Sequence, residues 1–220
     1  MKKDLAEKAQ NAVVPKSGAS ARGYEDTENT DFIIPRVELL QALSPAVVDG
    51  VGRPGQIVNS ISKDLIDNLE FVPVFLKKTY IRWIPRDEGG GMVYQTDDPQ
   101  DERVIQDSVW VNDNPPTCTA YLNFMCLFEG MEAPIILSFA KTGYKIGRKL
   151  LSMAKMTGLD MFASRYLLGS ELVKGDTGPY HQFTVKKVGP TPSETFAIAE
   201  KMYETFSEKK IIIDHSQESE

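Results

Sequence analysis

Residues 69–85 read LEFVPVFLKKTYIRWIP and carry the strongest strand signal in the 220-residue chain. β-Branched and aromatic residues dominate this stretch, and such residues favour a pleated, half-buried surface. A straight strand of this length is unusual, and Pro73 has no amide hydrogen to donate to a neighbouring strand. The stretch therefore predicts one long strand with a bend or bulge near Pro73.

Further strands are expected on both sides of this stretch. Glu129-Gly130 and the KGDTG sequence of residues 174–178 are turn signals that join neighbouring strands into antiparallel hairpins. Composition and turn residues together predict strands over residues 55–62, 92–95, 108–111, 119–128, 133–139, 162–173 and 180–188.

Two helices are expected among these strands. The first covers residues 143–157, with Thr142 as its N-cap and Gly158 directly after its end. The second begins at the capping box TPSE of residues 191–194 and extends to about Lys209. This order of elements predicts a mainly β fold with α elements, namely an OB-like antiparallel β-barrel with an inserted helix and a C-terminal helix.

The chain is expected to form one folded domain with two tails. A hydrophobic content of 41% can fill one sizeable core, but 220 residues are few for two domains. Residues 1–30 hold few large apolar side chains and are predicted to stay flexible. The OB-like domain then spans residues 31–209, and residues 210–220 form an acidic C-terminal tail. We expect residues 211–220 to be dispensable for folding and to compete with polyanions for basic surfaces.

The two cysteines predict free thiols and a cytoplasmic location. Cys118 and Cys126 lie eight residues apart, which on one strand separates them by roughly 26 Å and excludes a disulfide between them. Free thiols favour a reducing compartment. The N-terminal residues lack the apolar centre of a signal peptide, and no apolar run is long enough to cross a membrane.

Positive charge is concentrated in two segments, although the net charge is −6. Residues 71–86 hold four basic residues and no acidic ones, and residues 134–190 hold nine basic residues against three acidic ones. The rest of the chain is strongly acidic, above all residues 87–113 and the two ends. Such segregation can create a local positive field on a globally acidic protein.

Basic and aromatic side chains occur together in three segments. Strand alternation places Lys78, Tyr80 and Arg82 on one face of the first segment and Trp83 on the other. Single-strand binders need this combination, because cations follow the phosphates while rings stack on the bases. The alternative in each segment is an ordinary solvated face, with Trp83 in the core. The candidate nucleic-acid-binding residues are Lys77, Lys78, Tyr80, Arg82, Trp83, Arg86, Lys141, Tyr144, Lys145, Arg148, Lys149, Arg165, Tyr166, Tyr180, Phe183, Lys186 and Lys187.

No catalytic or metal-binding motif is recognisable. The glycines of residues 89–91 lack the Lys-Ser/Thr that follows in a phosphate-binding loop. The carboxylates of residues 97–102 could in principle hold Mg²⁺, but a solvated acidic loop explains them better. His181 and His215 are remote from the cysteines, so no zinc site is expected. We expect a protein that is not an enzyme and uses no cofactor and no metal.

Three blocks of sequence carry a resemblance to a known family. They are IPRVELLQALSPAV with GRPGQIVNSIS, FVPVFLKKTYIRWIPR, and PIILSFAKTGYKIGRKLLSMAK, within residues 33–206. These blocks resemble bacteriophage proteins described as single-stranded-DNA-binding proteins. The resemblance implies an oligonucleotide-binding fold and sequence-independent coating of DNA during replication, recombination or repair, in the host cytoplasm. The positions that match are the basic and aromatic residues of segments 77–86 and 141–149.

Several alternatives stay open at this point. The main alternative is a phage virion structural or assembly protein without DNA-binding activity, whose charges serve assembly. A nuclease is a third reading. The resemblance also implies that an acidic tail contacts replication or recombination proteins, and the tail here holds three acidic residues in its last seven. Homo-oligomerisation and the preference between DNA and RNA are not fixed by the sequence.

Overall fold

The computed structural model describes residues 33–67, 69–85, 88–131, 133–175 and 178–208, together with residues 26, 213 and 215. The chain divides into two units, residues 1–32 and residues 33–220, and the fold described below is that of the second. The segment predicted to be flexible, residues 1–30, lies outside the described residues except for Asp26.

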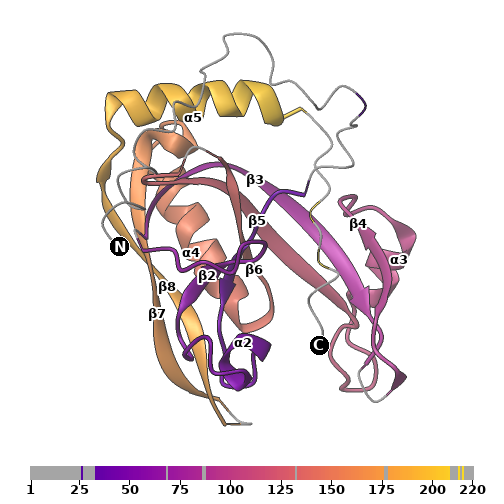
Figure 1. Ribbon diagram of the computed structural model, residues 1–220. Helices are drawn as coiled ribbons and strands as arrows, with labels where there is room; N and C mark the ends of the chain where they lie inside the picture. The colour runs from indigo at the N-terminus through magenta and orange to yellow at the C-terminus, as the bar shows by residue number, and fades with distance from the viewer. Residues whose placement is uncertain are drawn as a thin grey trace. The chain divides into compact units, whose positions relative to one another are not determined.

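Six strands form one large antiparallel sheet (Figure 1). Their order is β6-β5-β3-β7-β8, and β4 also pairs with β3. β3 is a single strand whose register with β5 shifts between Pro73 and Phe75, so the predicted bulge is confirmed. The strands are β3 (Glu70–Trp83), β4 (Met92–Thr96), β5 (Cys118–Phe128), β6 (Ile135–Phe139), β7 (Ser164–Gly175) and β8 (Gly178–Pro190).

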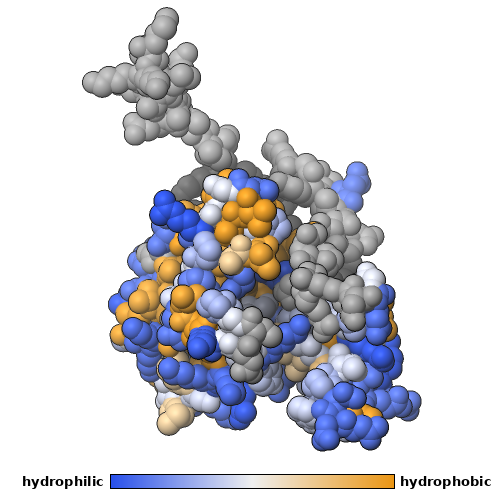
Figure 2. Space-filling view, turned by 90° about the horizontal axis from the view of Figure 1, so that it is seen from below, coloured by the Kyte–Doolittle hydropathy of each residue, from blue (hydrophilic) through white to orange (hydrophobic). Residues whose placement is uncertain are grey.

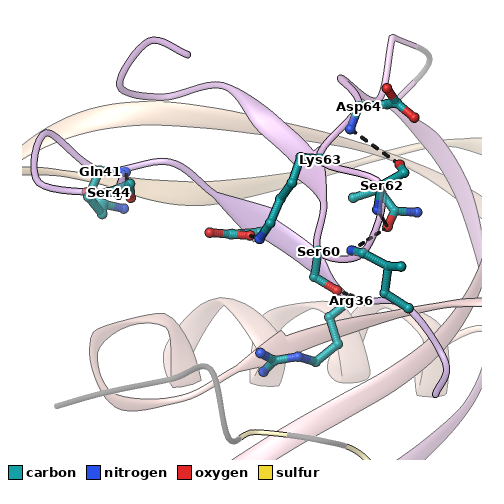
Figure 3. Close-up of polar contacts among 10 residues, drawn as sticks. Arg36, Gln41, Ser44, Ser60, Ser62, Lys63 and Asp64 are labelled. Carbon is teal, nitrogen blue, oxygen red and sulfur yellow. Dashed lines mark hydrogen bonds and ion pairs between the residues drawn. The ribbon is translucent and has the colours of Figure 1, made fainter. Parts of the chain in front are cut away.

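A small hairpin precedes the large sheet. It consists of β1 (Val37–Leu39), the short helix α2 (Pro45–Val48) and β2 (Ile57–Asn59). Figure 3 shows the polar contacts that fix it, among them the Arg36 amide, which donates to Ser60 Oγ at 2.8 Å, and the Lys63 ammonium, 2.7 Å from a carboxylate oxygen of Glu38. These local bonds hold a hairpin whose strands are only three residues long.

The small hairpin contacts both outer strands of the large sheet. On the β6 side the amide of Ile136 donates to the carbonyl of Pro35 at 2.8 Å. On the β8 side the Gln41 amide group donates to the carbonyl of His181 at 2.8 Å and accepts from its N–H at 2.9 Å. No ladder joins β6 to β8 in the described residues, so the sheet is open and the predicted closed barrel is not confirmed.

The core lies on both faces of the sheet. The helices are α3 (Glu102–Asp107), α4 (Tyr144–Lys155) and α5 (Ser193–Phe206), with 3-10 turns η2 (Lys141–Gly143) and η3 (Met161–Ala163). Phe124 and Met125 are neighbours on β5, and both are fully buried. Phe124 packs in a cluster with Leu150 of α4, whereas Met125 packs in another with Ala199 of α5. The two helices therefore cover opposite faces of the sheet.

Two sequence predictions fail in the acidic region. Residues 108–111 form no strand, and Val111 makes only an isolated bridge with Asn114. The preceding residues form α3 instead of a loop, with Asp101 as an N-cap that accepts a hydrogen bond from the Arg103 amide at 3.0 Å. A carboxylate at the N-cap satisfies one of the free amides of the first turn, which explains the helix in this acidic stretch.

The predicted helix caps are only partly correct. Gly158 follows α4 with a positive φ of 68°, as predicted. Thr142 is not the N-cap, because it lies inside η2, and α4 begins after Gly143. The capping box before α5 makes no side-chain cap hydrogen bond, and α5 ends at Phe206, short of Lys209.

Candidate nucleic-acid interface

The exposed side of α4 carries only cations among its charged residues. Lys145, Arg148, Lys149 and Lys155, called the basic face below, are all exposed. α4 contains no acidic residue. Within the part of the chain that the structure describes, none of the four forms an ion pair. The predicted one-sided distribution of cations on this helix is confirmed.

Close packing under α4 fixes the orientation of the basic face. Gly147 and Leu150 are buried, and a Cβ atom on Gly147 would lie 2.8 Å from Phe139 Cβ and 3.0 Å from Leu122 Cδ1. Only glycine allows this approach of helix and sheet. The opposite side of the helix must therefore face solvent. Tyr144, at the first position of α4, is half-buried against the same core.

The β7–β8 hairpin contributes fewer of the candidates than expected. Lys186 and Lys187 are exposed on β8, which packs against α4. Arg165 instead pairs with Glu70 at 2.6 Å. Tyr166 is fully buried, and burial raises the pKa of its hydroxyl. Tyr166 therefore cannot contact DNA in this fold.

The other rings of this region lie partly inside the protein. Phe183 makes an edge contact with Phe139, with ring centroids 5.8 Å apart, and is half-buried. Tyr180 is half-buried beside Gly175, where a Cβ atom would meet its ring at 2.9 Å. The predicted interleaving of exposed rings and cations is thus absent from the described part of the hairpin.

The far end of β3 belongs to an arm, defined here as residues 79–83 and 88–117. The predicted alternation is confirmed, because Ile81 and Trp83 are buried whereas Tyr80 and Arg82 are only half-buried on the other face. The Trp83 indole donates to the Tyr121 hydroxyl at 3.3 Å, so this ring is part of the core. In this fold Trp83 is therefore shielded from solvent, unlike Tyr80 and Arg82.

Acidic residues of the arm neutralise its central cation. Both carboxylate oxygens of Asp107 lie 3.1 Å from Arg82 Nη1, and one accepts a 2.9 Å hydrogen bond from the Tyr94 hydroxyl. Burial, with hydrogen bonds to Cys118 and Asp107, raises the pKa of Tyr94 well above its ordinary value. Arg103 pairs with Asp101 and lowers the pKa of that carboxyl.

Two candidates next to the arm retain some exposure. Lys78 is exposed and Lys77 is half-buried, and with Tyr80 they line an open hollow of about 370 Å³ that also contains Asp97. The Asp97 carboxylate repels a phosphate group that would approach this hollow. Arg86 lies outside the described residues.

The comparison with known proteins identifies the family. Residues 5–212 match the model of a family described as Pam3 phage gp34-like protein. This chain belongs to the Pam3 phage gp34-like family. Neither the curated proteins nor the solved structures contain a match to it. The resemblance to bacteriophage proteins is thus supported as far as the phage relationship, and DNA binding is not part of what the family name states.

Two described residues near the C-terminus of this gp34-like chain, Ile213 and His215, pack on the α5 side of the sheet. Ile213 is buried with Ala199, and its carbonyl accepts a hydrogen bond from the Gln95 amide at 3.0 Å. His215 is fully buried, with its ring 4.5 Å from that of Tyr121. Neither residue lies on the α4 side, and the expectation that residues 211–220 are dispensable for folding stays a prediction that the burial of these two residues does not favour.

Two further observations concern sites outside the basic face. The described residues of this family member contain no cluster of histidine, cysteine or carboxylate groups arranged to hold a metal ion. None of its described helices has the length and apolar character needed to cross a membrane. The exposure of the Trp110 ring was not expected, because the apolar run of residues 109–111 predicted a strand.

Proposed function

We propose that this protein binds single-stranded DNA without sequence preference, through the basic face of α4 together with exposed cations of β8, the strand that α4 contacts. In this proposal it acts in phage DNA replication, recombination or repair as a binding protein and not as an enzyme, in the host cytoplasm. The preference for single strands rests on the sequence resemblance and on the half-buried rings near the helix.

The single observation that carries the proposal is the uncompensated charge of α4. Lys145 and Lys149 are four residues apart and Lys145 and Arg148 are three apart, so like charges lie on adjacent turns and repel. The exposed cations do not stabilise the fold, because the packing of α4 involves the residues on its buried side. A polyanion on this face removes the repulsion and releases its own counterions, which makes association favourable at low salt.

The arrangement around α4 suits a single strand better than a duplex. Tyr144 and Tyr180 are half-buried residues, and an aromatic ring that keeps one face accessible can stack on an unpaired base for about 1–3 kcal/mol. An OB-like arrangement, in which the small hairpin bridges β6 and β8, remains part of the proposal. α4 lies against β5, β6 and β8 of this sheet.

Fluorescence anisotropy of a labelled oligo-dT tests the proposal. We expect binding whose affinity falls with salt, with a log–log slope of about −0.7 per phosphate contact. A duplex probe of equal length should bind more weakly. An affinity for oligo-dT that is absent, or unchanged between low and high salt, would contradict the proposal and favour a role in virion structure or assembly.

A further inference from the structure

The tip of the arm exposes three consecutive apolar residues. Val109, Trp110 and Val111, called the tip below, are exposed to 52%, 69% and 55%. The following turn places Asn112 and Asp113 at positive φ and returns the chain to Asn114, which bridges Val111. A tryptophan this exposed contributes nothing to the core, and tryptophan is among the residues most enriched at the centres of protein interfaces.

The arm that carries the tip is rich in acidic residues. The described residues 88–117 contain seven acidic residues and one arginine. Glu102 and Asp113 are exposed and form no ion pair with any residue that the structure describes. In Figure 2 the arm is the mostly hydrophilic projection at the lower right, with a small hydrophobic area. A surface that binds the tip must therefore offer apolar side chains together with cations.

The C-terminal end of α4 offers this combination. Met156 and Leu159 follow the helix directly and are exposed to 86% and 67%. Lys149 and Lys155 of the basic face precede them without a counter-charge in the described chain. Methionine adapts readily to the shape of a partner, and cations over an indole face attract it.

We propose that the tip of one copy docks on α4 of a second copy, with Trp110 against Met156 and Leu159 and the acidic residues against the basic face. Figure 1 shows the arm and α4 on separate parts of the molecule, so the contact joins two chains. The two surfaces differ, which makes the contact heterologous and able to continue from copy to copy unless a ring closes.

One consequence rests on the proposed function. If the basic face also binds single-stranded DNA, DNA and the tip compete for it, and each suppresses the other. Self-association itself does not depend on DNA binding, so the two claims can fail separately.

Sedimentation velocity of the whole chain at low salt, without DNA, tests self-association. We expect the mean mass to rise above the monomer mass of 24.5 kDa as concentration increases, and to return to it at high salt. Trp110→Ala and the pair Glu102→Lys, Asp113→Lys should each stay monomeric, as should the pair Lys149→Glu, Lys155→Glu. An equimolar mixture of the two charge-reversed proteins should assemble again, because each then offers the complement of the other.

A wild-type protein that stays at 24.5 kDa at every concentration would overturn the proposal, as would a Trp110→Ala variant that assembles like the wild type. Added oligo-dT should lower the number of protein chains in each wild-type assembly. If assemblies persist when oligo-dT is saturating, DNA and the tip do not compete for the same site, although DNA binding itself is then supported. If oligo-dT does not bind at all, the proposed function fails while self-association stands.

Discussion

The cations of α4 and the cation of the arm on β3 differ in their surroundings in the fold, because among the described residues only the cation of the arm is paired with a carboxylate. Residues 77–86, which lead into the arm along β3, and residues 141–155 each combine cations with an aromatic residue, so sequence alone makes both segments candidates for a DNA-binding surface. In the fold, Arg82 of the arm meets Asp107, whereas the four cations of the basic face meet no described carboxylate. A cluster of cations thus indicates a binding surface only when the fold brings no acid to it.

The largest expected effect concerns the two tryptophans of the chain. Trp83→Ala should lower the free energy of unfolding by about 3–5 kcal/mol, because the ring is buried and its removal leaves a cavity. Trp110→Ala should change it by less than about 0.5 kcal/mol, because that ring is exposed. Urea denaturation followed by circular dichroism measures both. A larger loss for Trp110 than for Trp83 would mean that the arm does not have this structure.

The close packing between α4 and the sheet can be tested by adding a methyl group at Gly147. Gly147→Ala should lower the free energy of unfolding by about 1–3 kcal/mol, since the added methyl meets Phe139 Cβ and outweighs the gain in helix propensity. Gly143→Ala is the matched control, because its nearest neighbour would be 3.9 Å away. If thermal denaturation shows both variants equally stable, α4 does not approach the sheet as closely as described.

The difference between paired and unpaired cations can be tested directly with one variant from each region. Arg82→Ala removes the partner of Asp107 and should cost under about 1 kcal/mol of stability, given that Arg82 is 42% exposed. Its affinity for oligo-dT should be unchanged. Lys149→Ala should leave stability unchanged and weaken DNA binding. The reverse pattern in paired denaturation and anisotropy measurements would assign binding to the arm.

A smaller effect concerns the pH dependence of stability and the buried Tyr94 of the arm. Burial raises the pKa of Tyr94 and of the Cys118 thiol, so both groups are neutral in the fold at ordinary pH. The contribution of these two groups to folding stability is fully present below their ordinary pKa values. It is lost as the pH rises through their raised pKa values in the fold. Stability should therefore decline above about pH 9. The stability of the Tyr94→Phe variant should decline less, which urea denaturation at stepwise higher pH measures. An equal decline of the variant and the wild type would show that Tyr94 does not cause the pH dependence.

Much of the fold could be predicted from residue pattern. The long strand with its bulge at Pro73, the β7–β8 hairpin and the cations on one side of α4 follow from alternation, turn residues and helical spacing, which are local properties. α3 could not, because a short helix stabilised by the carboxylate of Asp101 has the composition of an acidic loop. Local pattern also gave no sign that the sheet stays open.

The errors at the site arise from contacts between distant segments. Arg82 and Asp107 are 25 residues apart in sequence, and only the folded arm brings them together. Arg165 was likewise neutralised by Glu70, 95 residues away. The burial of Ile213 and His215 depends on a surface formed by β3, β4 and β5, and no short stretch near the C-terminus predicts it.

The most direct test compares two triple variants of equal charge in one oligo-dT titration at moderate salt. Lys145→Ala, Arg148→Ala and Lys149→Ala remove most of the basic face, and Arg53→Ala, Lys174→Ala and Lys201→Ala remove three exposed cations elsewhere. We predict that the first protein binds at least about tenfold more weakly, with a log–log salt slope smaller in magnitude by about 2, and that the second binds like the wild type. Equal affinities of the two variants would contradict the assignment of DNA binding to α4.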